Sequence, residues 1–129
     1  MLVVDDDPSI RAIMSDLFMS EGYAVRTAAN GLEALAQVAE WPPQVIFLDV
    51  QMPVMDGPQF AAAYRSLSIS PDPPARVIVV TASNDLAGRC HRVQADGCVG
   101  KPFDLDELLD LVVEPHHAHA IANANQLAS

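Results

Sequence analysis

The amino-acid sequence predicts an α/β fold: a single doubly wound, five-stranded parallel sheet flanked by five helices. The main observation is that short apolar runs, rich in β-branched residues, alternate with segments of helical periodicity along the 129 residues. Such runs are typical of strands buried on both faces, and their alternation with helices builds a parallel sheet. Half of the residues are hydrophobic, so a chain of this length buries a substantial core as one domain.

The first strand and helix are predicted at the start of the sequence. Leu2 to Val4 is a short apolar run, and Pro8, after three acidic residues, suits the first turn of a helix. Gly22 ends this helix. Apolar residues recur at spacings that place them on one inward helical face: Ile10, Ile13, Met14, Leu17 and Phe18.

The second strand and helix, and the third strand, follow. Residues 24–26 are a brief strand candidate, and Asn30 can cap a helix that ends near residue 39. The residues expected to face inward are Leu32, Leu35 and Val38. Pro42-Pro43 stops this helix before VIFL at 45–48, which is predicted to be a strand buried on both faces.

The remaining units complete the alternation. Pro58 can open a third helix that runs to about residue 67. Residues 77–80 are the fourth strand, 85–94 a weakly helical stretch, and 98–100 the fifth strand. A last helix, capped by Asp104, carries four apolar residues: Leu105, Leu108, Leu109 and Val112.

Composition narrows the function classes. The formal net charge is −10, which argues against direct binding to nucleic acid or to an anionic membrane, because both need a basic patch. No apolar run approaches the roughly 18–20 residues that span a bilayer, and MLVVDDDP lacks a signal-peptide pattern. Cys90 and Cys98 are expected to be small hydrophobic residues without a disulfide role, which suits a reducing cytoplasm.

Polar residues follow four of the predicted strands. Asp5 and Asp6 follow the first, Asp49 the third, Thr81 the fourth and Lys101 the fifth. Ligands bind beyond the carboxyl ends of the strands in such sheets, so these side chains are expected to converge on one edge. Carboxylates about 4 Å apart repel by about 4 kcal/mol at an effective dielectric constant of about 20. A divalent hard cation such as Mg²⁺ relieves that repulsion.

The same residues suit phosphoryl transfer. An ionised aspartate beside the metal can attack phosphorus, and aspartyl phosphate is an established kind of covalent intermediate. Lys101 supplies a positive charge for phosphoryl oxygens, while the Thr81 hydroxyl and the backbone N–H of Ala82 supply hydrogen bonds. A nucleotide-binding domain is excluded, since no glycine-rich phosphate loop follows any strand.

At these residues the chain resembles the response-regulator receiver domains of two-component signalling. The matching segments are VVDDD at 3–7, LDVQMPVMDG at 48–57, VVTAS at 79–83 and ADGCVGKPF at 95–103. Their order and spacing make the resemblance specific. It implies a flavodoxin-like fold with strand order 2-1-3-4-5 and a receiver domain over residues 1–114.

The resemblance also implies residue roles. Asp49 would accept a phosphoryl group from a histidine kinase or histidine phosphotransfer protein, and Thr81, Ala82 and Lys101 would bind the phosphoryl oxygens. The Lys101–Pro102 bond would be cis, which for an X–Pro bond costs only about 0.5–1 kcal/mol. Phosphorylation would change the surface of the fourth helix, fifth strand and fifth helix. The Mg²⁺ ligands would be Asp5, Asp6, Asp49 and the backbone carbonyl of Gln51.

Two positions depart from the family pattern. Receivers usually carry an aromatic residue or His three residues before the lysine, at the switch position, and this chain has Cys98 there. Gln94 replaces the glycine that commonly ends the fourth helix. If that position requires a positive φ, Gln94 carries a strain on the order of 1 kcal/mol. Residues 115–129 are expected to be a flexible or non-native tail.

Two alternative functions share part of this residue pattern. A haloacid-dehalogenase-type phosphatase also uses a strand-end aspartate, but it needs Asp-x-Asp, and Gln51 occupies the second position here. A degenerate receiver would act as an unphosphorylated docking module, yet all five site residues are present. A receiver is not expected to be an enzyme beyond its own phosphorylation and slow dephosphorylation.

Overall fold

The computed structural model describes residues 1–67, 74–82 and 84–112. A parallel five-stranded sheet has the order β2-β1-β3-β4-β5, as predicted. The strands are β1 (Leu2–Val4), β2 (Arg26–Ala28), β3 (Val45–Leu48), β4 (Arg76–Ala82) and β5 (Gly97–Lys101). The helices between them are α1 (Pro8–Ser20), α2 (Gly31–Glu40), α3 (Gly57–Arg65) and α4 (Leu86–Val93). Residues 105–112 form a further helix, called the C-terminal helix below.

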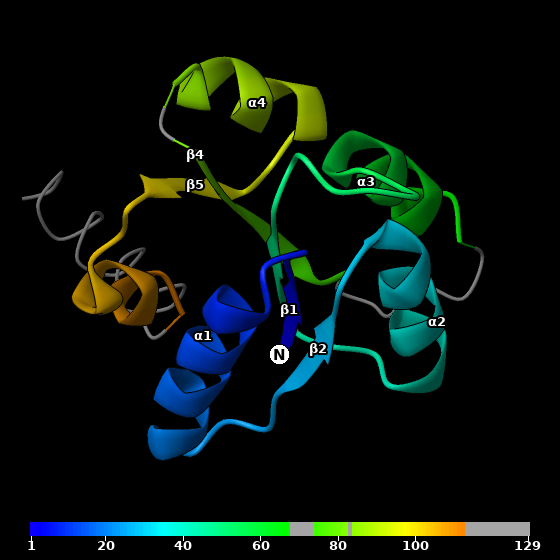
Figure 1. Ribbon diagram of the computed structural model, residues 1–129. Coiled ribbons are helices and arrows are strands. Elements are labelled where there is room, and N and C mark those ends of the chain that lie inside the picture. Colours follow the sequence, from blue (N-terminus) through cyan, green and yellow to red (C-terminus); the bar gives the residue numbers. More distant parts are fainter. Residues whose placement is uncertain (68–73, 83, 113–129) are drawn as a thin grey trace, which may run out of the picture.

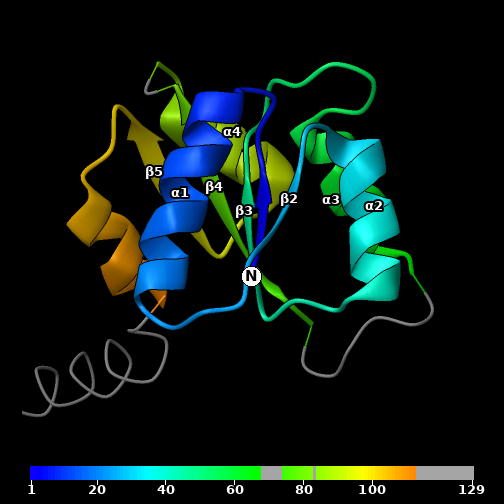
Figure 2. The same cartoon turned by 60° about the horizontal axis from the view of Figure 1, so that its bottom comes forward.

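Helices cover both faces of the sheet. Figure 2 shows α1 and the C-terminal helix on one face and α2 and α3 on the other, while Figure 1 shows α4 beside β4 and β5. Alternate strand residues pack on opposite faces: Leu2 and Val4 join the cluster under α2, α3 and α4, whereas Val3 joins the cluster under α1. This alternation follows from the two-residue period of a strand and explains why both faces of each strand are apolar.

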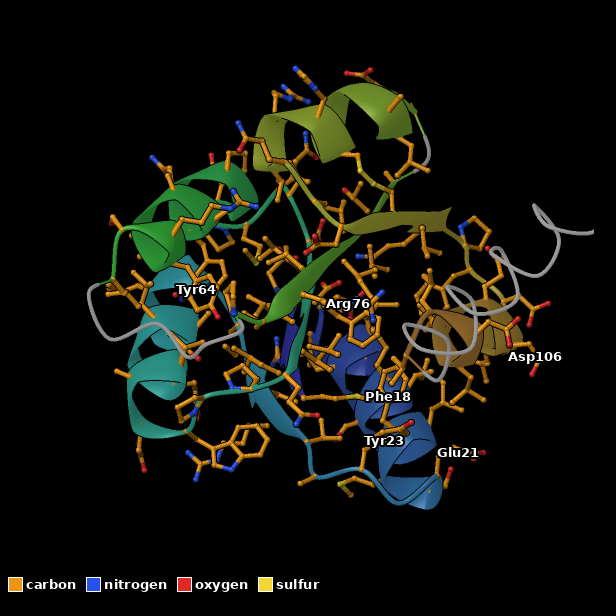
Figure 3. All side chains as sticks on the ribbon, turned by 180° about the vertical axis from the view of Figure 1, so that it is seen from behind. Phe18, Glu21, Tyr23, Tyr64, Arg76 and Asp106 are labelled. Atoms are coloured by element: carbon orange, nitrogen blue, oxygen red, sulfur yellow. A yellow bond between two sulfur atoms is a disulfide. The ribbon has the colours of Figure 1, made fainter. Side chains whose placement is uncertain are left out.

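Aromatic stacking anchors α1 to the sheet. The Phe18 ring is fully buried and stacks on Phe47 of β3 with 4.8 Å between ring centroids. Tyr23, just beyond the helix, meets Phe18 edge-on (Figure 3). Phe18 thus lies on the inward face of α1, as its spacing in the sequence predicted.

Helix starts are set by short polar side chains. The Asp7 carboxylate accepts from the backbone N–H of Ser9 at α1, and Asn30 accepts from Glu33 at α2. At α3, Asp56 and Gln59 form a reciprocal capping box. Each pair satisfies backbone donors that the first turn of a helix leaves without partners.

Several local predictions were wrong. Ile13 and Leu32 are exposed rather than inward, because Met14 with Phe18, and Ala34 with Val38, form the buried stripes of α1 and α2. β2 begins at Arg26, two residues later than predicted, since its pairing with β1 runs from Leu2 opposite Arg26.

The predicted backbone departures are present. Gln94 ends α4 with φ of +56°, so this position does adopt the left-handed conformation on which the expected strain depended. The Lys101–Pro102 peptide bond is cis, as expected.

The cysteine prediction was also wrong, because a disulfide joins Cys90 of α4 to Cys98 of β5. Their Cα atoms are 6.0 Å apart, within the usual range for a disulfide. The helix–turn–strand connection brings the two residues face to face, which the sequence separation of 8 does not reveal.

Two further observations bear on the sequence predictions. Within the described ranges, no helix combines the length and apolar character needed to cross a membrane. The expected tail at 115–129 lies outside the described residues.

Candidate functional site

The carboxyl ends of four neighbouring strands meet at one edge of the sheet. Val4 of β1 pairs with Leu48 of β3, so the next residues, Asp5 and Asp49, are neighbours. The Asp49 N–H donates to the Val4 carbonyl at 2.9 Å and fixes this relationship. On the other side of β3, Ala82 of β4 pairs with Lys101 of β5. The parallel register thus brings together the residues that the sequence placed at strand ends.

Three carboxylates form a cluster at this edge. Asp5, Asp6 and Asp49 each offer an oxygen, and these oxygens lie within 4.8 Å of one another. Asp5 and Asp49 are buried, whereas Asp6 is exposed and lines, with Gln51, an open pocket of about 470 Å³. Hard oxygen donors with an open side fit the preference of Mg²⁺ for carboxylates plus water. The donor set therefore fits the expected cation.

Lys101 reaches across the sheet to this cluster. Its Nζ atom donates to an Asp5 oxygen at 2.7 Å and to an Asp49 oxygen at 3.2 Å. Burial alone lowers the pKa of Lys101, but the hydrogen bond to Asp5 and the charges of Asp49 and Asp5 raise it overall. The ammonium group is therefore positively charged at neutral pH.

The environment of Asp5 disfavours its ionised form. Burial raises the pKa of its carboxyl group, and the neighbouring charge of Asp49 raises it further. The hydrogen bonds from Lys101 and from the Asp7 backbone N–H, the latter at 2.9 Å, lower it but do not restore the ordinary value. An additional positive charge at this position would therefore favour the ionised form of Asp5.

The loop after Asp49 depends on a glycine. A Cβ atom at Gly57 would lie 2.7 Å from the Asp49 carbonyl oxygen and 2.8 Å from the Val50 Cα atom. The Gly57 N–H instead donates to the Val50 carbonyl at 2.8 Å. The Asp56-Gly57 turn thus brings α3 close against the end of β3 and holds the loop that carries Gln51.

Thr81 completes the predicted set, and it has a partner that the sequence analysis missed. Its hydroxyl oxygen is buried and accepts a hydrogen bond of 3.0 Å from Arg89 of α4. Arg89 lies four residues before the buried Val93, so both occupy one helical face. A charged residue on the apolar face of the predicted fourth helix was the feature of the sequence that could have revealed this contact.

The residue at the expected switch position is one half of the disulfide. Cys98 lies on β5 and is partly buried, and its partner Cys90 is the residue after Arg89. Ala82 is exposed at the end of β4. The structure thus gathers the predicted carboxylates, Thr81, Ala82 and Lys101 at one edge of the sheet and adds Arg89, whereas Cys98 lies further back on β5, opposite Val79.

The response regulator receiver domain family matches residues 1–113. The chain belongs to this family. Its fold is the flavodoxin-like fold of receiver domains, and the phosphatase alternative is not favoured.

Curated relatives agree with this assignment. Sporulation initiation phosphotransferase F of Bacillus subtilis is 36% identical over 114 residues, which cover 87% of this chain and 89% of that protein. The transcriptional regulatory protein KdpE of Mycobacterium tuberculosis is 38% identical over 112 residues. That alignment covers 84% of this receiver domain but only 47% of KdpE, so the chain spans about half of that relative.

Solved receiver structures share the fold. The chemotaxis protein CheY4 of Vibrio cholerae is 36% identical with a TM-score of 0.76, covering 86% of this chain and 92% of that chain. The response regulator TrrA of Thermotoga maritima, solved in complex with Mg²⁺ and BeF, is 33% identical with a TM-score of 0.74. That match covers 88% and 95% of the two chains. The protein is thus a receiver domain of a two-component phosphorelay, a class that interacts with histidine kinases or phosphotransfer proteins.

Proposed function

We propose that Asp49 is the phosphoacceptor and that it takes its phosphoryl group from a phosphohistidine in a Mg²⁺-dependent reaction. The observation that carries this proposal is the position of the Asp49 carboxylate. It lies at the end of a buried strand, beside two other carboxylates and within hydrogen-bonding distance of Lys101. In the proposed step an Asp49 oxygen forms a bond to phosphorus while the N–P bond breaks. The electron pair of that bond returns to the imidazole of the donor.

The surrounding residues would position the reactants. Asp5, Asp6, Asp49 and the Gln51 carbonyl would hold Mg²⁺, which when bound would offset the negative charge of carboxylates and phosphoryl oxygens. The flexible Lys101 side chain would keep its positive charge next to the transferred phosphoryl group. Thr81 and the Ala82 N–H would donate hydrogen bonds to the phosphoryl oxygens. Phosphoryl transfer depends mainly on such positioning and charge stabilisation, and the presence of this residue set supports the proposal.

We also propose the wider setting of the reaction. The receiver unit would comprise residues 1–114, which nearly coincide with the family match, with 115–129 as a tail. The protein would act in the cytoplasm, where ATP supplies the kinases that phosphorylate receivers, and it would turn over no other substrate. The net charge of −10 supports a protein partner over direct contact with nucleic acid or an anionic membrane.

Substitution of Asp49 tests this function. Asp49→Asn is expected to keep the fold, because the amide has nearly the same size, and to lose labelling by a radiolabelled phosphohistidine donor with Mg²⁺. Wild-type protein with a chelator should also remain unlabelled. Acid-labile but base-stable labelling, or persistent labelling of Asp49→Asn, would place the phosphoryl group on another residue.

A further inference from the structure

Arg89 is the one buried charged residue in the described ranges that the proposed reaction leaves without a role. Four polar or charged residues there are buried, and three of them, Asp5, Asp49 and Thr81, belong to the site. Arg89 is the fourth, with 7% of its surface exposed. It lies in the middle of α4 and reaches the end of β4, where its Nη1 atom donates to Thr81 Oγ1 at 3.0 Å.

This hydrogen bond fixes the direction of the Thr81 hydroxyl. A guanidinium group can only donate, so Thr81 Oγ1 is the acceptor, and the hydroxyl proton must point elsewhere. A hydroxyl that accepts from a cation is polarised and becomes a better donor in turn. The hydrogen bond from Arg89 therefore leaves the Thr81 hydroxyl proton free to be donated to another acceptor at the sheet edge.

The charge of Arg89 lacks a carboxylate partner. Among the residues that the structure describes, no carboxylate forms an ion pair with its guanidinium group. Arg92, three residues later on the same helix, is exposed and yet pairs with Asp85 at 3.7 Å. A buried cation without an anion is destabilising. An anion that arrives beside Thr81 would remove that penalty.

We propose that Arg89 is a positioning residue of the phosphoryl site. It holds Thr81 as a hydrogen-bond donor to the phosphoryl group on Asp49, and the negative charge of that group complements the buried guanidinium. This inference rests on the proposed role of Asp49. Because Arg89 belongs to α4, the same bond transmits the position of Thr81 to that helix, at a place where Cys98 provides no aromatic ring.

Binding of beryllofluoride, a phosphoryl mimic, tests the proposal on the intact protein. Arg89→Gln should weaken beryllofluoride binding in saturating Mg²⁺ by about tenfold, the size of one charge-assisted hydrogen bond. Binding of Mg²⁺ alone should change by less than about twofold, because the carboxylates are untouched. Arg89→Lys, which keeps the charge, should recover part of the loss. Calorimetric titration measures both affinities.

A matched control variant shows whether the loss of any positive charge weakens beryllofluoride binding, and a double-mutant cycle shows whether Arg89 acts through Thr81. Arg26→Gln removes the same charge from β2, which β1 and β3 separate from β4 and Thr81, and should bind beryllofluoride as wild type does. Thr81→Val should weaken binding, and Arg89→Gln should add little in that background, because Arg89 acts through the hydroxyl. Fully additive effects would overturn this mechanism.

The melting temperature distinguishes positioning from a purely structural role. Arg89→Gln should melt no lower than wild type with Mg²⁺ alone, but beryllofluoride should raise its melting temperature less. Equal beryllofluoride affinity in wild type and Arg89→Gln would overturn the inference and leave the role of Asp49 intact. If wild type itself fails to bind beryllofluoride, the proposed function fails, and the role of Arg89 fails with it.

Discussion

The ammonium group of Lys101 lies 2.7 Å from a carboxylate oxygen of Asp5, although 96 residues separate them in the sequence. The same nitrogen lies 3.2 Å from Asp49, so one cation bridges two buried carboxylates. β5 and β1 are not neighbours in the sheet, and the long lysine side chain spans the strands between them. In the metal-free protein this bridge balances charge that Mg²⁺ would otherwise offset.

Replacing Lys101 by Ala is expected to destabilise the metal-free protein. The change leaves Asp5 buried without its cation, and we expect a loss on the order of 1–3 kcal/mol, because the lysine is partly exposed. Millimolar Mg²⁺ should restore more stability to Lys101→Ala than to wild type, since the metal no longer competes with an ammonium group. Urea unfolding with and without Mg²⁺ measures both effects. An identical Mg²⁺ response would show that Lys101 and the metal do not share the carboxylates.

The identity of the cation should also matter for signalling. Lys101→Arg keeps the charge but replaces a compact ammonium with a larger planar group of a different shape, which cannot occupy the position of the lysine nitrogen between the two carboxylates. Beryllofluoride binding should therefore remain well below wild type in this variant. Full recovery would indicate that only the charge is needed.

The metal prediction concerns Asp6, the exposed member of the cluster. In wild type, millimolar Mg²⁺ should raise the melting temperature by mass action. Asp6→Ala removes a ligand without opening the core and should lose most of that rise. Asp7→Ala is the matched control: it removes the adjacent acid and the α1 cap, lowers stability by about 1 kcal/mol, and should keep the Mg²⁺ response. Equal responses in wild type and Asp6→Ala would place the metal elsewhere.

The raised pKa of Asp5 gives a pH dependence of known sign. The folded protein binds this proton more tightly than the unfolded chain, so stability from Asp5 is present at low pH and is lost as pH rises through the raised pKa. Asp5→Asn should therefore become more stable relative to wild type as pH rises toward neutrality. Chemical unfolding at several pH values, without Mg²⁺, measures this difference. A stability difference that is independent of pH, or that reverses, would contradict the prediction.

The features that could be predicted from the sequence are those that depend on short local patterns of residues. Apolar runs such as VIFL locate the strands, and the parallel sheet then places Asp49 beside Asp5 because strand ends share one edge. The family pattern drew attention to Gln94, because a glycine commonly ends the fourth helix, and its positive φ depends only on that local position.

The unpredicted features depend on distances between elements. The Arg89–Thr81 hydrogen bond depends on which face α4 turns toward the sheet. That orientation is set by the packing of α4 against β4 and β5. The Cys90–Cys98 bond requires the separation of the same elements. Residues 85–94 are only weakly helical in pattern and carry few apolar residues. Sequence periodicity therefore could not predict the orientation of α4 or its distance from β5.

The last prediction concerns how phosphorylation changes the surface. The Cys90–Cys98 disulfide ties α4 to β5, so the side chain at the switch position is held by its partner and does not exchange between inward and outward positions. A ligand shifts a conformational equilibrium only by its differential affinity for the two states. With the disulfide intact, beryllofluoride should therefore change amide hydrogen exchange over residues 86–98 only slightly. The change should centre instead on Thr81 and Lys101.

Reduction of the disulfide provides the comparison. A thiol reductant should release α4 from β5, and beryllofluoride should then produce a larger change in hydrogen exchange over α4, carried by the Arg89–Thr81 bond. Cys90→Ala and Cys98→Ala should both behave as the reduced protein does, because either substitution removes the same link while only one alters the switch position. If Cys98→Ala alone loses the beryllofluoride response and Cys90→Ala keeps it, the Cys98 side chain itself couples the site to the surface. In that case neither the disulfide nor Arg89 controls the motion of α4.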